Sequence, residues 1–179
     1  MTSIKKCLLR VTVTGLVIFI NFILQSTLFD YIRIGAIKPN TALVIIVCYA
    51  ILRGDIEGAI FGFFAGLLHD MFFGNVIGLH ALLGTIIGFF CGKPFKSFYN
   101  ENFMLPITLV AVSSIFYEFG IYFFSFLFRG RIDIMHYFWT IILPTTVYAI
   151  ILSVPIYRLI YGINDLLEEK EDKHRQLFK

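Results

Sequence analysis

The sequence has little charge and none of the common patterns of catalysis. Only 15% of its 179 residues are charged and 58% are hydrophobic, whereas an ordinary soluble domain has about 25% charged and about 45–50% apolar residues. It contains no nucleophile elbow, zinc-protease, phosphate-loop or dinucleotide-binding pattern. The composition excludes an ordinary soluble domain, and the missing patterns predict a protein that is not an enzyme and carries no cofactor.

Cysteine is also scarce. Cys7, Cys48 and Cys91 stand singly in or beside apolar runs, without C-x-x-C spacing, so we predict neither a zinc site nor a disulfide framework. His69 and Asp70 are adjacent, but successive side chains of a helix point about 100° apart, so this pair alone does not predict a metal site. The net charge is only +3 and the basic residues are scattered, which predicts no nucleic-acid partner.

Long apolar runs make up most of the chain. A transmembrane helix needs about 20 residues, and aromatic side chains, 17% of this sequence, are well solvated by a bilayer. The candidate spans are Leu8–Phe29, Pro39–Leu52, Ile56–Phe73, Ile77–Gly92, Phe103–Phe128 and His136–Tyr161, of which the second and fourth are short. The first is longer than the apolar core of a secretory signal, about 7–15 residues, and is expected to remain as a span. We predict an all-α, polytopic membrane protein of about six transmembrane helices.

The basic residues orient these spans. If the chain starts in the cytoplasm, eleven of its 15 Lys and Arg residues lie inside and only Arg33, Lys38, Arg129 and Arg131 lie outside. Short cytoplasmic loops are enriched in Lys and Arg, so both termini are expected in the cytoplasm. We therefore expect residues 1–162 to form a single six-helix membrane domain and residues 163–179 to form a charged cytoplasmic tail.

Glycine is concentrated in the third and fourth spans. Nine of the 14 glycines lie between positions 54 and 92, many of them four residues apart. Small residues at this spacing let two transmembrane helices approach closely, and such contact is a main source of cohesion in lipid. We predict that these two spans pack backbone to backbone through Gly58, Gly62, Gly66, Gly84, Gly88 and Gly92.

A few polar side chains interrupt the spans, among them Glu118 in the fifth. Asp70 follows Gly54 by about 24 Å of helix, which places it in the outer leaflet. Intramembrane polar groups are costly when unpaired and are candidates for function. At this level we predict a polar cluster of Gln25, Asp70 and His80. Arg33 or Lys38 would lie above the cluster, which either ties the helices together or meets a partner.

Four segments carry a family resemblance. They are LQSTLF (Leu24–Phe29), IKPNTALVIIVCYAILRG (Ile37–Gly54), GAIFGFFAGLLHD (Gly58–Asp70) and GLHALLGTIIGFFCG (Gly78–Gly92). Taken in this order, they resemble the MreD family of bacterial rod-shape-determining membrane proteins. The family's acidic residue falls on Asp70 and its glutamine on Gln25, whereas Asn40 stands where many members have an acidic residue.

The resemblance implies a non-enzymatic scaffold of the cell-elongation machinery in the bacterial plasma membrane. Such a protein is involved in cell shape and peptidoglycan synthesis with MreC, the most direct partner, and with MreB, RodA and its penicillin-binding transpeptidase. The resemblance also implies a helical fold like that of the substrate-binding subunits of energy-coupling-factor vitamin transporters.

A substrate-binding membrane subunit of a vitamin transporter is the alternative function. Such subunits often present alanines with small-xxx-small spacing on the first span, and Leu8–Phe29 contains no alanine. Copurification separates the two hypotheses, because MreC would accompany a scaffold and a pair of ATPases would accompany a transport subunit.

Overall fold

The computed structural model describes residues 2–27, 40–74, 77–93, 104–129 and 134–176, and every regular element in these ranges is helical. The helices are α1 (Thr2–Thr27), α2 (Thr41–Arg53), α3 (Asp55–Phe73), α4 (Leu79–Gly92), α5 (Met104–Arg129), α6 (Ile134–Tyr137), the π-helix η2 (Phe138–Ile142) and α7 (Leu143–Gln176). The last three follow one another directly and occupy the sixth predicted span. The predicted all-α class is confirmed.

The helices differ in whether they are long enough to cross a bilayer. Met104–Phe124 and Met135–Asn164 are long and apolar enough by length and composition. Thr14–Gln25, Thr41–Arg53 and Leu79–Gly92 are shorter apolar helices. The 13 residues of α2 extend about 20 Å, less than the hydrocarbon core of about 30 Å. A helical membrane protein fits these observations, and α2 and α4 are short as predicted.

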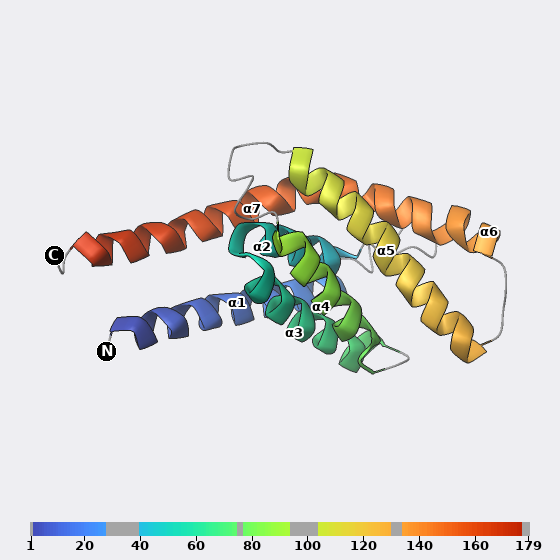
Figure 1. Cartoon of the computed structure of the whole chain (residues 1–179), viewed down its shortest axis with the longest axis horizontal. Coiled ribbons are helices and arrows are strands. Elements are labelled where there is room, and N and C mark those ends of the chain that lie inside the picture. Colours follow the sequence, from blue (N-terminus) through green and yellow to red (C-terminus); the bar gives the residue numbers. More distant parts are fainter. Residues whose placement is uncertain (1, 28–39, 75–76, 94–103, 130–133, 177–179) are drawn as a thin grey trace.

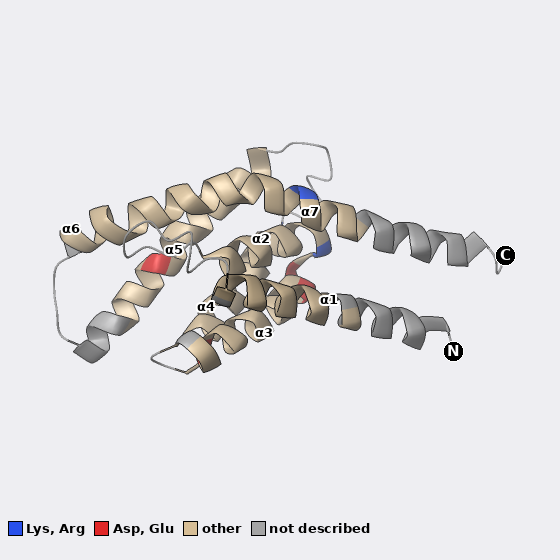
Figure 2. Ribbon diagram, turned by 180° about the vertical axis from the view of Figure 1, so that it is seen from behind, with Lys and Arg blue, Asp and Glu red and all other residues tan. Residues whose placement is uncertain are grey.

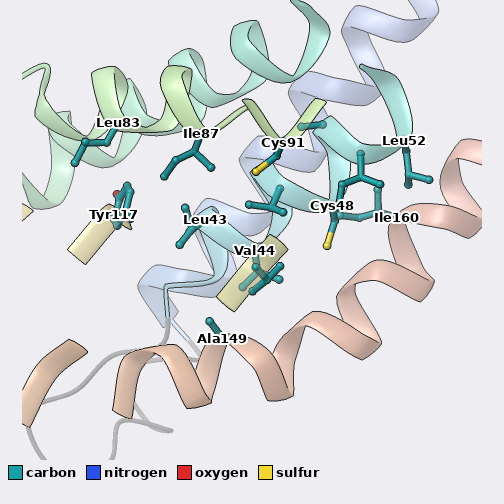
Figure 3. Packing of buried hydrophobic residues seen from close by; sticks show 14 of the residues in the cluster. Leu43, Val44, Cys48, Leu52, Leu83, Ile87, Cys91, Tyr117, Ala149 and Ile160 are labelled. Carbon is teal, nitrogen blue, oxygen red and sulfur yellow. The ribbon is translucent and has the colours of Figure 1, made fainter. Parts of the chain in front are cut away.

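The apolar helix α2 lies at the centre of the bundle. It packs against α3, α4, α5 and α7, while α1 covers α2 and α3 (Figure 1). A helix that is apolar all round is expected to be buried. Accordingly Leu43, Val44 and Cys48 of α2 are buried, and Figure 3 shows Leu43 and Val44 between Ile87 of α4 and Ala149 of α7.

The outer surfaces of the bundle are apolar. Phe19, Ile60, Phe116 and Ile151 each expose about half or more of their surface. Charged side chains among the described residues are few, and several of them gather where α2 meets α3 (Figure 2). Lipid, which solvates apolar side chains, is the environment that such a surface requires.

The two ends of the described chain extend in one direction. The N-terminal part of α1 and the C-terminal part of α7 project from the same side of the bundle (Figure 1). Helix α7 continues without a break through the expected boundary between residues 162 and 163. The charged segment that follows is therefore an extension of the last helix up to Gln176.

Candidate functional site

Helices α3 and α4 touch through their backbones at the centre of their interface. A methyl group on Gly84 would lie 2.6 Å from the carbonyl oxygen of Gly62, and one on Gly58 would lie 2.7 Å from the carbonyl oxygen of Gly88. In the reverse direction, a methyl group on Gly62 would meet the carbonyl group of Gly84, and one on Gly88 would meet the carbonyl group of Gly58. The space at these positions admits no side chain larger than hydrogen.

The same close approach extends to both ends of the pair. A methyl group on Gly66 would lie 2.6 Å from the Cα atom of Ala81, and one on Gly92 would lie 2.5 Å from the Cα atom of Asp55. All six glycines singled out in the sequence thus face neighbouring backbone. Backbone contact over this length makes α3 and α4 the most extensively packed helices of the described chain.

The Asp70 carboxylate connects the C-terminal end of α3 to the start of α4. Its side chain is fully buried. The Oδ2 atom accepts hydrogen bonds from the backbone N–H groups of Gly78 and Ala81, both at 3.0 Å. The Oδ1 atom accepts the backbone N–H of His80 at 3.1 Å and lies 2.7 Å from Nδ1 of the same residue. Four polar contacts therefore saturate this carboxylate.

This arrangement caps α4 from another helix. The first N–H groups of a helix have no partner within it, and a nearby negative charge stabilises them. The residue at the capping position of α4 is Gly78, which has no side chain to serve as a cap and adopts a φ of 98°, a conformation that favours glycine. Asp70 takes over the capping role, so the geometry favours a tie between helices for this residue.

The polar contacts continue from His80 into α5 and toward α2. The His80 ring stacks on His69 with 4.5 Å between centroids, and it meets the edge of Tyr117 at 5.9 Å. Tyr117 is buried and lies beside Asn40. Asn40 caps α2 by accepting the backbone N–H of Leu43 at 3.1 Å. An amide can cap a helix about as well as a carboxylate, so Asn40 fills this structural position without a charge.

The three members of the predicted polar cluster do not all join in this network. Asp70 and His80 are in direct contact, but none of the hydrogen bonds described for Asp70 involves Gln25. Gln25 is half-buried on α1, and α1 reaches the end of α3 through Phe22, whose ring lies 4.6 Å from that of Phe72. Arg33 and Lys38, predicted above the cluster, lie outside the described residues.

Reactive side chains in the spans also serve packing. The Cys91 sulfur lies 3.1 Å from the hydroxyl oxygen of Ser113, which joins α4 to α5. Thr146 donates its hydroxyl to the carbonyl oxygen of Ile142, as membrane hydroxyl groups often do within a helix. Within the described ranges, no three His, Cys, Asp or Glu residues are grouped so that they could hold a metal ion.

Sequence reasoning missed Tyr117. An aromatic residue in an apolar span resembles the many that face lipid, and only the crossing of α4 and α5 places Tyr117 against His80. Its position directly before Glu118 was the available signal, because a residue next to an intramembrane acid can lie near the polar interior.

Comparison with models of known protein families gives a match over most of the chain. Residues 5–163 match the family model described as rod shape-determining protein MreD. This range includes α2, α3, α4, α5 and the helix from α6 to the middle of α7, with most of α1. No curated protein and no solved structure shows a significant match to the chain.

Proposed function

Because this chain belongs to the MreD family of rod shape-determining proteins, we propose that it is a non-enzymatic membrane scaffold of the bacterial cell-elongation machinery. The family match over residues 5–163 carries the proposal. A role in determining rod shape follows from the family. The proposal adds that the protein acts in peptidoglycan synthesis with MreC as its direct partner, and with MreB, RodA and its transpeptidase in the same complex.

The contacts of the polar side chains support a role without catalysis. The oxygens of Asp70 are engaged in holding α3 to α4, and Ser113 contacts Cys91 instead of a general base. A nucleophile needs a base within hydrogen-bond reach, and that base needs a third group to orient it. The described part of the chain uses these groups for cohesion between helices.

We further propose six membrane spans, with both termini on the cytoplasmic side of the bacterial plasma membrane. The distribution of Lys and Arg supports this orientation. The common direction in which α1 and α7 leave the bundle agrees with an even number of crossings (Figure 1). In this topology residues 1–162 form the membrane domain, and residues 163–179 extend α7 into the cytoplasm.

Reporter fusions test this topology. Reporters fused after Lys179 and within Lys93–Asn102 are expected to show cytoplasmic activity, because the positive charges there favour the inner side. A reporter between Arg129 and Met135 is expected to show external activity. An external C-terminus would remove the six-span topology.

Depletion in a rod-shaped bacterial host tests the function. Loss of the protein is expected to give rounded cells, because elongation would lack its scaffold, and light microscopy measures the ratio of cell length to width. Full-length protein purified from the same membranes is expected to carry MreC. Rods that persist after complete depletion, or copurification of a pair of ATPases in place of MreC, would contradict the proposal.

A further inference from the structure

Helix α5 buries an acidic side chain that has no hydrogen-bond or ion-pair partner in the described part of the bundle. Glu118 is the only acidic residue of α5 and is 8% exposed. Among the described residues, none donates a hydrogen bond to its carboxyl group or forms an ion pair with it. Asp70, in contrast, has four polar contacts. Intramembrane carboxyl groups almost always have partners, so a partner for Glu118 is to be sought beyond the described residues.

The surroundings of Glu118 give a second indication of a binding site. Tyr122 lies one helical turn further along α5, and its ring packs on Tyr137 of α6 with 4.7 Å between centroids. Glu118 is close enough to Tyr137 to interact with it electrostatically. Directly after Tyr137 the backbone widens into the π-helix η2, which packs against α5. Single π-helical turns within longer helices occur frequently at functional sites.

Glu118 lies at the border between the packed and the lipid-facing sides of α5. Ile115 and Phe119, on one side of it, are 46% and 53% exposed, whereas Ser114 and Tyr117, on the other side, are buried. We call Ile115, Glu118 and Phe119 the Glu118 face. A ligand can therefore approach the carboxyl group sideways from the bilayer.

The depth of Glu118 in the bilayer indicates which kind of ligand can reach it. Glu118 lies about 21 Å along α5 from Met104 and about 16 Å before Arg129, so it sits near the middle of a hydrocarbon core of about 30 Å. Lipid headgroups lie outside this core. A protein helix that crosses the membrane can place a polar side chain at this depth.

Symmetry argues against a second copy of this chain as the ligand. A two-fold contact places the same surface on both sides of the interface. It would bring two Glu118 carboxyl groups together, and these could not both be ionised, because like charges in a medium of low polarity repel strongly. A different protein with complementary chemistry avoids this repulsion.

We propose that the Glu118 face docks a transmembrane helix of another protein, and that this helix brings a hydrogen-bond donor or a positive charge to the Glu118 carboxyl group. The donor is the side chain of Ser, Thr, Asn, Gln, Lys or Arg. This inference rests on the proposed scaffold function, because it names the surface by which the scaffold holds a membrane partner.

Photo-crosslinking in the native host membrane tests the inference with the full-length protein. A photoreactive amino acid replaces Phe119, and a matched control carries it at Phe64 of α3, which is similarly exposed. The Phe119 probe is expected to form an adduct with a transmembrane segment that contains a donor side chain. Adding Glu118→Leu is expected to reduce this adduct at least fivefold, whereas Glu118→Gln, which can still hydrogen bond, retains most of it.

The Glu118→Leu variant is expected to accumulate normally in the membrane, because the substitution removes an unpaired polar group. Replacing the donor on the crosslinked helix by leucine is expected to reduce the adduct as much as Glu118→Leu does. Lipid adducts alone, adducts with a second copy, or an adduct unchanged by Glu118→Leu would each overturn the inference. Rounded cells after depletion, combined with any of these results, would reject the docking face and keep the scaffold.

Discussion

Replacing Gly62 by leucine is expected to lower the amount of folded protein in the membrane at least tenfold. The first side-chain carbon would meet the carbonyl group of Gly84, which is backbone and cannot rotate away. Excess volume costs about 1–3 kcal/mol where side chains can give way. For Gly62→Leu the loss of stability is expected to be about 3 kcal/mol or more, because α3 and α4 would have to separate. Size-exclusion chromatography of the solubilised, fluorescently tagged protein measures the folded fraction.

Gly15→Leu provides the matched control. Gly15 is also a helical glycine. Apart from its chain neighbours and the adjacent backbone of its own helix, no atom lies within 4 Å of a methyl group placed there. This variant is expected to accumulate like the unmodified protein, because leucine is also a better helix former than glycine. If Gly62→Leu were tolerated as well as Gly15→Leu, the glycines of α3 would not lie against another helix.

Asp70→Asn is expected to lower the free energy of unfolding by about 3 kcal/mol, close to the effect of Asp70→Leu. From the sequence alone, asparagine should be a mild replacement, because it keeps a polar group of the same size. The structure reverses this expectation. Three backbone N–H groups and Nδ1 of His80 point at the two carboxylate oxygens. Asparagine has only one side-chain oxygen. Its NH₂ group would take the place of the other oxygen and would face N–H groups that it cannot accept hydrogen bonds from.

His80→Phe separates the capping role of Asp70 from its contact with the His80 ring. This variant keeps the backbone N–H groups of α4 and loses only the contact with Nδ1, so a smaller loss of about 1 kcal/mol is expected. Denaturant unfolding of the three variants in one detergent measures the difference. Wild-type stability of Asp70→Leu would show that Asp70 does not cap α4, and wild-type stability of Asp70→Asn would show that one side-chain oxygen is enough.

The sequence predicted the helices better than the contacts between them. Four of the six apolar runs became helices within two residues of their predicted ends, because length and apolarity decide helix formation in lipid. Helix α1 begins six residues before the predicted Leu8, and α7 continues to Gln176, beyond the predicted Tyr161. The α3–α4 contact was predictable from the spacing of the glycines. A four-residue period of small residues can be read from the sequence of each helix alone, and it marks the face on which another helix can approach closely. The relation between Glu118 and Tyr137 was not predictable, because it depends on how α5 packs against the helix that begins at α6.

The partners of Asp70 show the same limit. Sequence reasoning paired this residue with the side chains of Gln25 and His80, but three of its four contacts are with backbone N–H groups. Backbone donors carry no signal in the sequence. The relevant signal was Gly78, whose left-handed conformation starts α4 without a capping side chain. An acidic residue at the end of the preceding helix then becomes the available cap.

The central claim is that the protein acts as a non-enzymatic scaffold, so that its function depends only on its folded structure. The most direct test measures cell shape against the amount of folded protein. In a depletion strain, titrated expression of the unmodified chain gives a reference curve of length-to-width ratio. Gly62→Leu and Asp70→Leu are expected to fall on this curve, and Ser113→Ala and Cys91→Ala are expected to give rods at the wild-type amount. Rounded cells containing a full amount of folded Ser113→Ala or Cys91→Ala protein would contradict the scaffold and indicate chemistry at that residue.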